Sequence, residues 1–199
     1  MGQLDHSKLR AAAGCLAAAF EGYPLLDWVL EGAVAPSAAR LTVFDALLRH
    51  FGYPSGTVWG SACLEGVAVW IDSTRIPRTD CRASGILADL ARANGRVGLR
   101  RSILAESQMQ AHHPEAPHLY LYLIGVIPTC RERGIGRTLL KAGLRRADRE
   151  GVGVFLETSM ERNIAFYSRR GFMIRDCYRT ASGSPSTWTM WREPVRRRL

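Results

Sequence analysis

The chain has 199 residues, 47% of them hydrophobic, with 27 Lys and Arg against 18 Asp and Glu and a net charge of +9. This is the length of about one domain, and the composition is that of a globular protein with a buried core. The most apolar run, residues 119–126, is too short to cross a bilayer, and residues 1–10 contain no apolar signal segment. We therefore expect a cytoplasmic protein that does not contact membranes.

The cysteines and histidines indicate neither a disulfide framework nor a metal site. The five cysteines are widely spaced, odd in number and without a C-x-x-C pair. His112, His113 and His118 cluster before a predicted strand, but no two histidines form an H-x-x-x-H pair. We therefore expect no bound metal.

A net positive charge can indicate nucleic-acid binding. The basic residues comprise 25 Arg and 2 Lys, however, and they are spread along the whole chain. No helix-turn-helix pattern and no aromatic-and-basic stacking motif accompanies them. We therefore expect no nucleic-acid partner, although the charge would suit a ligand that carries phosphates. The sequence leaves a monomer and a homodimer open.

In chain order, the periodicity of the apolar residues alternates between helices and strands. It predicts helices over 8–20, 25–30 and 38–51, strands over 57–63 and 67–71, helices over 80–93 and 97–112, a strand over 118–127, a helix over 137–150, a strand over 152–158, a helix over 163–170, and strands over 172–177 and 187–191. Ser37 is expected to cap the third helix, and Leu64–Gly66 to turn a hairpin. The short polar segment 1–7 shows no convincing strand. The alternation predicts an α/β domain on a mixed sheet.

A loop with two glycines, Gly134 and Gly136, joins the strand that ends at Pro128 to the helix over 137–150. The first amides of a helix have no partner inside it and carry partial positive charge, so they bind an anion. Glycine lets a pyrophosphate approach such amides closely. The loop matches neither a P-loop nor the dinucleotide fingerprint. Taken alone, it is equally compatible with a tight strand-to-helix turn.

The string Arg131-x-x-Gly134-x-Gly136 resembles the acetyl-CoA loop of the GNAT superfamily of N-acetyltransferases. A second string, Asn163 to Tyr167 followed by Gly171-Phe172, resembles a later segment of the same superfamily. The likeness to the superfamily covers about residues 118–192. A looser likeness to the puromycin N-acetyltransferase-like enzymes, in segments 17–24, 67–70, 155–159 and 187–190, extends over most of the chain.

The resemblance implies the GNAT fold, an α/β (α+β) fold with a mixed, mostly antiparallel central sheet of about six to seven strands. Helices flank this sheet, and two of its strands splay apart at a bulge where acetyl-CoA binds. The resemblance also implies a single domain over residues 1–199. Residues 1–117 would form the acceptor side, 118–192 the acetyl-CoA-binding core and 193–199 a basic tail.

The implied cosubstrate is acetyl-CoA, with no metal. The residues that would bind it lie on the splayed strand, in the glycine loop and at the start of the next helix: Ile124, Val126, Arg131, Arg133, Gly134, Ile135, Gly136, Arg137 and Thr138. Asn163 is expected to hydrogen-bond the CoA arm, with a helix cap as the alternative. An amide near Val126 or Ile127 is expected to face the thioester carbonyl. Gly125 suits a strand position that another group approaches closely.

Two residues are catalytic candidates. Tyr167 stands where the superfamily places a tyrosine general acid, and a phenol keeps its proton at neutral pH. The alternative is a helix tyrosine with a structural role. Glu157 lies in an otherwise apolar strand, where burial would raise its pKa toward that of a useful base. The alternative is a structural carboxylate paired with an arginine, and His113 and His118 are weaker candidates for the base.

Tyr23, Tyr120 and Tyr122 are expected to line the acceptor pocket, while most other aromatic residues pack the core. The implied function is transfer of an acetyl group to the primary amine of a small molecule, such as an antibiotic or another secondary metabolite. A protein or peptide acetyltransferase and a non-catalytic acyl-CoA-binding module are the alternatives. They stay open because residues 75–115, which would grip the acceptor, diverge from the resemblance.

Overall fold

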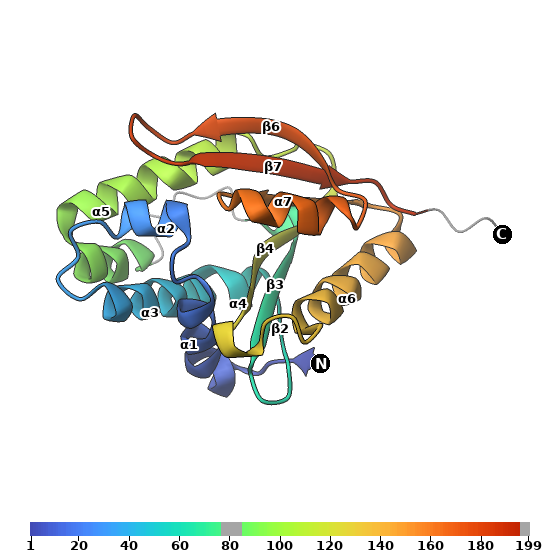
Figure 1. The fold of residues 1–199 in the computed structure, drawn as a ribbon, viewed down its shortest axis with the longest axis horizontal. Coiled ribbons are helices and arrows are strands. Elements are labelled where there is room, and N and C mark those ends of the chain that lie inside the picture. Colours follow the sequence, from blue (N-terminus) through green and yellow to red (C-terminus); the bar gives the residue numbers. More distant parts are fainter. Residues whose placement is uncertain (77–84, 196–199) are drawn as a thin grey trace.

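The structure is a computed structural model that describes residues 1–76 and 85–195 (Figure 1). Its centre is a seven-stranded sheet in the order β1-β2-β3-β4-β5-β7-β6. Neighbouring strands are antiparallel except for β4 and β5, which are parallel. The expected mixed, mostly antiparallel sheet flanked by helices is therefore confirmed.

The strands are β1 (Gly2–Gln3), β2 (Gly56–Gly60), β3 (Gly66–Asp72), β4 (His118–Val126), β5 (Gly153–Thr158), β6 (Met173–Arg179) and β7 (Ser186–Arg192). The α-helices are α1 (Leu9–Ala19), α2 (Pro24–Val29), α3 (Pro36–Leu47), α4 (Tyr53–Ser55), α5 (Ile86–Ala111), α6 (Ile135–Glu150) and α7 (Glu161–Ser168). Shorter turns are η1 (His6–Lys8), the π-helical η2 (Leu48–Gly52), η3 (Ser73–Arg75) and η5 (Pro128–Cys130). No helix of the described segments has an apolar stretch long enough to cross a membrane.

The polar N-terminus contains a strand where the sequence shows no convincing one. Gly2 and Gln3 pair with Gly60 and Trp59 of β2, so β1 adds a short edge strand to the sheet. Both residues of β1 are exposed. Their pairing uses backbone groups, which every residue type carries, and so no apolar pattern marks it.

Two helices also differ from the sequence-based expectation. Pro36 takes the first position of α3, where its fixed φ suits a helix, so the N-cap is Ala35 and Ser37 lies inside the helix. The helices expected over 80–93 and 97–112 join in α5, which is interrupted at Gly95, where φ is 64° and ψ is −168°. Residues 80–84 of the first of these lie outside the described residues.

Helices cover both faces of the sheet (Figure 1). α1 and α3 pack on one face, in a buried cluster that includes Leu16 and Val69. α6 and α7 pack on the other face, in a cluster that includes Trp70 and Leu140. Val69 and Trp70 face opposite sides because successive strand residues alternate. A third cluster joins α5 to α3.

The parallel strands β4 and β5 separate partway along their length. Residues 118–121 of β4 pair with residues 153–156 of β5, and the pairing ends there. On its other edge, β4 remains paired with β3 as far as Val126, which lies opposite Gly66. The second half of β4 therefore has one paired edge and one open edge.

A β-bulge in β4 marks the point of separation. Val69 of β3 pairs with Leu123, whereas the next residue, Trp70, pairs with Leu121. Tyr122 is therefore the extra residue. A bulge bends its strand and increases the local twist. The expected splaying of two strands at a bulge is thus present.

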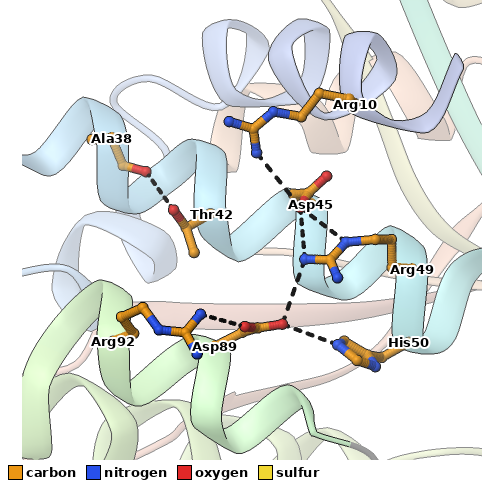
Figure 2. A network of polar contacts seen from close by, with 8 residues as sticks. All are labelled: Arg10, Ala38, Thr42, Asp45, Arg49, His50, Asp89 and Arg92. Carbon is orange, nitrogen blue, oxygen red and sulfur yellow. Dashed lines mark hydrogen bonds and ion pairs between the residues drawn. The ribbon is translucent and has the colours of Figure 1, made fainter.

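Ion pairs link α1, α3, η2 and α5, as Figure 2 shows. Asp45 of α3 contacts Arg10 of α1 at 3.5 Å and Arg49 of η2 at 2.7 Å. Asp89 of α5 contacts Arg49 at 3.5 Å and His50 at 3.0 Å. The hydrogen bond from His50 is the largest cause that lowers the pKa of Asp89. These contacts hold α5 against α3.

Gly143 determines how closely α6 lies on β3. A Cβ atom at position 143 would lie 2.2 Å from the ring of Trp70, far inside normal carbon contact. We expect Gly143→Ala to lower the free energy of unfolding by about 1–3 kcal/mol through overpacking, although alanine is the better helix former. Urea unfolding followed by circular dichroism measures this change.

Gly14 in α1 provides the matched control, because nothing lies within 4 Å of a Cβ atom there. We expect Gly14→Ala to raise the free energy of unfolding by up to about 1 kcal/mol through helix propensity alone. If Gly143→Ala also stabilised the protein, the close packing of α6 on Trp70 would be wrong.

Candidate active site

A cavity of about 360 Å³ lies where β4 and β5 separate, with walls from the α1–α2 turn, α2, α3, α5, α7, β4, β5 and β7. Its lining includes Phe44 and Tyr120 from the cluster on the α1 face of the sheet. It also includes Ile124 and Tyr167 from the cluster on the α6 face. The cavity therefore extends through the sheet, with side chains of both faces in its wall.

The cavity brings together the predicted catalytic and acceptor residues. The predicted site residues in its lining are Tyr23, Tyr120, Tyr122, Ile124, Glu157, Asn163 and Tyr167. The predicted residues of the glycine loop and of the start of α6 are not part of this lining. They lie beyond the end of β4, and their geometry is described below.

Glu157 lies near the end of β5 and is held by two tyrosines. Its Oε2 accepts a hydrogen bond from the Tyr120 hydroxyl at 3.0 Å, and its Oε1 accepts one from Tyr178 at 2.8 Å. Burial raises the pKa of Glu157 to about 7, the two tyrosine hydrogen bonds oppose this rise, and the charge of Glu106 adds to it. A carboxyl with this pKa exchanges its proton near neutral pH, as a general base must. Its partners are tyrosines, not the arginine of the structural alternative.

Tyr167 projects from α7 and is 5% exposed. Its ring contacts Phe166 and Phe172, with centroids 5.3 and 5.7 Å away. Burial raises the pKa of Tyr167 above its ordinary value, and the neighbouring Tyr23 adds to the rise. Tyr167 therefore keeps its proton at neutral pH and presents a proton donor in the cavity wall.

Two further tyrosines shape the cavity. The Tyr23 hydroxyl accepts a hydrogen bond from the Ser159 amide at 2.8 Å, which ties the α1–α2 turn to the end of β5. Tyr122 packs against Phe51 and Tyr120, with ring centroids 4.8 and 5.7 Å apart. Burial raises the pKa of both Tyr23 and Tyr122, so both present neutral phenols.

His113 and His118 are not part of the cavity lining. Their Nε2 atoms lie 3.0 Å apart, and both rings pack against Phe155. Burial lowers the pKa of His113 to about 4. The structure therefore does not bring these weaker base candidates to the predicted site. Within residues 1–76 and 85–195, no three His, Cys, Asp or Glu side chains form a group that could hold a metal.

The backbone at the end of β4 corrects one expectation. The Ile127 amide donates to the Glu65 carbonyl at 2.9 Å, so it is not free to face a thioester. Alternate residues of an antiparallel ladder direct their backbone groups to opposite edges. Since Ile127 faces β3, Ile124 and Val126 direct theirs toward the open edge of β4.

The arginines of the glycine loop hold the loop in place. Arg131 donates to the Ala19 carbonyl at 2.9 Å, and Arg133 pairs with Glu65 at 3.2 Å. Arg137 is exposed in the first turn of α6. Positive charge therefore surrounds the start of α6, but two of the three arginines also have protein partners.

The start of α6 is open at its two glycines. Gly134 is the N-cap residue with φ +80°, a left-handed conformation that favours glycine. No atom lies within 4 Å of a Cβ atom built at 134, and one at 136 would meet only Val126, at 3.5 Å. The Thr138 amide makes a helical hydrogen bond to the Gly134 carbonyl at 3.0 Å, and the Thr138 hydroxyl bonds the same oxygen at 3.1 Å. The amides that precede this bond are those of Ile135, Gly136 and Arg137.

The structure shows which groups surround Asn163 and Gly125. Asn163 lies inside α7, whose N-cap is Met160, so the helix-cap alternative is wrong. Its Nδ2 donates to Thr158 Oγ1 at 3.4 Å. At Gly125, a Cβ atom would lie 2.7 Å from Ala19, so the group that approaches this glycine closely is α1.

The structure adds one site residue that the sequence did not reveal, Glu106 of α5. Gln110 donates to its Oε1 at 3.0 Å, and burial raises the pKa of Glu106. Glutamate and glutamine four residues apart are typical of a solvated helix face. Nothing in the local sequence therefore distinguishes Glu106 from a surface residue.

Comparisons with known proteins agree with this geometry. The model of the acetyltransferase (GNAT) family matches residues 64–172. Among solved structures, one from Corynebacterium glutamicum, described as histone acetyltransferase HPA2 and related acetyltransferase, is similar with a TM-score of 0.70. Its sequence identity is 22%, over 100% of this chain and 97% of that one.

Two other solved structures share the fold at lower identity. The polyamine N acetyltransferase of Drosophila melanogaster has a TM-score of 0.57 and 16% identity, over 96% of this chain and 97% of that one. The ribosomal-protein-S18-alanine N-acetyltransferase of Escherichia coli has a TM-score of 0.53 and 15% identity, over 100% of this chain and 94% of that one. The matched family segment is more than half of the chain and contains Glu157 and Tyr167. The chain therefore belongs to the GNAT family of acetyltransferases, enzymes that take an acetyl group from acetyl-CoA.

Proposed function

We propose that this enzyme transfers the acetyl group of acetyl-CoA to the primary amine of a small molecule. The observation that carries the proposal is the cavity through the sheet, whose wall presents Glu157 and Tyr167 together. Glu157, with a pKa of about 7, is suited to remove a proton from an amine. Tyr167 keeps its proton at neutral pH and lies in the same wall, so that it can give this proton to a leaving group.

The residues beyond the cavity fit the donor. The open-edge backbone groups of Ile124 and Val126 suit the amide groups of a pantetheine arm, which would pair with them as a neighbouring strand does. The first amides of α6, with Gly134 before them, suit the pyrophosphate. Arg137 supplies a positive charge at the same place.

Acetyl-CoA supplies a thioester whose carbonyl carbon accepts attack by a neutral amine. Glu157 takes a proton from the acceptor nitrogen, directly or through a water, as the C–N bond forms. The Tyr167 hydroxyl gives its proton to the sulfur as the C–S bond breaks. We assign stabilisation of the oxyanion to the amide of Val126, which faces the open edge of β4. Proton exchange with solvent then restores both side chains.

The volume of the cavity supports a small acceptor. A volume of about 360 Å³ is in the range of small-molecule sites. The fold alone does not decide the acceptor, since one similar structure is a polyamine N acetyltransferase and another acts on a ribosomal protein. An antibiotic or another secondary metabolite with a primary amine belongs to the class we propose.

The proposed function is tested with purified protein, acetyl-CoA and a panel of amines, by following thiol release and the mass of the product. We expect turnover with small primary amines. Turnover restricted to peptides with a free N-terminus would assign the enzyme to protein acetylation. Binding of acetyl-CoA without release of the thiol in the presence of any acceptor would indicate a binding module.

Glu157 is expected to set the acidic limb of the pH profile of kcat/KM. A base must be unprotonated, so activity should fall as pH drops below about 7, the pKa of Glu157. Glu157→Gln should remove this limb and lower kcat/KM by about 100-fold or more. Initial rates across pH, with a saturating donor, measure both effects.

Tyr178→Phe tests the same assignment through a neighbour. The Tyr178 hydrogen bond lowers the pKa of Glu157, so its loss should move the acidic limb to higher pH. An unmoved limb in Tyr178→Phe would mean that another group titrates.

Tyr167→Phe removes the proposed proton donor while keeping the ring that packs on Phe172. We expect kcat to fall by about 100-fold or more, with the affinity for acetyl-CoA unchanged in a calorimetric titration. Tyr53→Phe is the matched control, because Tyr53 is 36% exposed and outside the cavity lining. Equal turnover of Tyr167→Phe and the wild type would remove Tyr167 from the mechanism.

A further inference from the structure

The cavity wall contains acidic side chains, whereas the protein as a whole is basic. The chain carries 27 Lys and Arg against 18 Asp and Glu. Among the described residues, the lining contains two carboxyl groups, Glu106 and Glu157, and neither lysine nor arginine. Its one histidine, His50, is paired with Asp89 at 3.0 Å. Such a wall attracts a cation and disfavours an anion.

Glu106 has one polar partner within the segments that the structure describes, the side chain of Gln110. That neutral amide bonds one of the two carboxylate oxygens, at 3.0 Å. A partly buried carboxylate is costly unless a cation or further donors compensate it. A positively charged ligand in the cavity would supply that compensation.

The two carboxyl groups come from different elements of the cavity wall, Glu106 from α5 and Glu157 from β5. Glu157 is bonded to Tyr120. The pKa of Tyr122 is raised by burial and, among charges, most by Glu106. The Tyr120 and Tyr122 ring centroids are 5.7 Å apart. Glu106 is therefore a second carboxyl group in the cavity, separate from the one that we assign to the reacting amine.

The remainder of the wall is mostly apolar. Aromatic and aliphatic side chains from the α1–α2 turn, α3 and η2, including Phe20, Phe44 and Phe51, line the same cavity as the two carboxyl groups. Aromatic rings and aliphatic groups suit a hydrocarbon linker and leave the polar ends of a ligand to the carboxyl groups. Ring faces also attract cations.

We propose that Glu106 binds a second positive charge of the acceptor, so that the preferred substrate is a dicationic amine with an apolar linker. This inference rests on the proposed acetyl transfer, in which Glu157 serves the amine that reacts. Glu106 is then a specificity residue: it touches the end of the acceptor that does not react.

The test compares straight-chain diamines of three to six carbons with the monoamines of equal length. We expect the wild type to prefer the diamines in kcat/KM by about 10- to 100-fold, as a charged hydrogen bond would give. Glu106→Gln should abolish most of this preference by raising KM for the diamines, with a much smaller change in kcat. Glu106→Asp should restore part of it.

Glu115→Gln is the matched control, since Glu115 is exposed and outside the cavity lining. Glu115→Gln makes the same change of charge as Glu106→Gln and should leave the preference for diamines unchanged. Circular dichroism confirms that each variant is folded. The inference would be overturned if Glu106→Gln lowered kcat/KM equally for diamines and monoamines. It would also be overturned if the wild type did not prefer diamines.

A calorimetric titration of the diamines into the protein separates this inference from the proposed function. Acetylation of monoamines alone, with diamine binding unaffected by Glu106→Gln, would keep the proposed function and refute the role of Glu106. Diamine binding that requires Glu106, without acetylation of any amine, would support the role of Glu106 and refute the proposed function.

Discussion

The hydrogen bonds between β4 and β5 end after Leu121 and Leu156, although both strands continue. Backbone groups in the middle of a sheet need partners, so an edge opened there requires water or a ligand to satisfy it. The open edge keeps its shape because the other edge of β4 is paired with β3 and because α1 packs directly on Gly125. The cavity, its lining from both faces of the sheet and the open backbone edge of β4 all follow from this separation.

The second constraint is the placement of a carboxyl group in the cavity wall. Glu157 takes its position from β5, and its two partners come from β4 and β6, so three strands fix one side chain. Its raised pKa means that the folded state holds the proton more tightly than the unfolded chain does. The stability contributed by the protonated form is therefore lost as pH rises from about 4.5, the ordinary value, to about 7. Ionised Glu157 thus destabilises the fold at the pH where it is chemically useful.

Local patterns in the sequence predicted most of the helices and strands, including those on either side of the glycine loop. Alternation in residues 118–127 predicted β4, and the spacing of Gly134 and Gly136 marked the start of α6. The pairing of Gly2 and Gln3 was not predictable because it involves no side-chain pattern. The occupation of the Ile127 amide by Glu65 depends on strand register, which periodicity does not give. Glu106 escaped notice for the same kind of reason, since only the packing of α5 brings it to the cavity.

α5 is held in the fold by different contacts from those that hold β4, β5 and α6. α5 packs mainly on α2 and α3, through apolar contacts and the ion pairs of Asp89. It contributes side chains to the cavity but no backbone pairing to the sheet. Substitutions on its inner face can therefore alter the wall around the acceptor while every strand pairing and the start of α6 stay intact. In evolutionary terms, substitutions in this one helix can change which amines such an enzyme accepts, while the groups proposed to bind the donor stay the same.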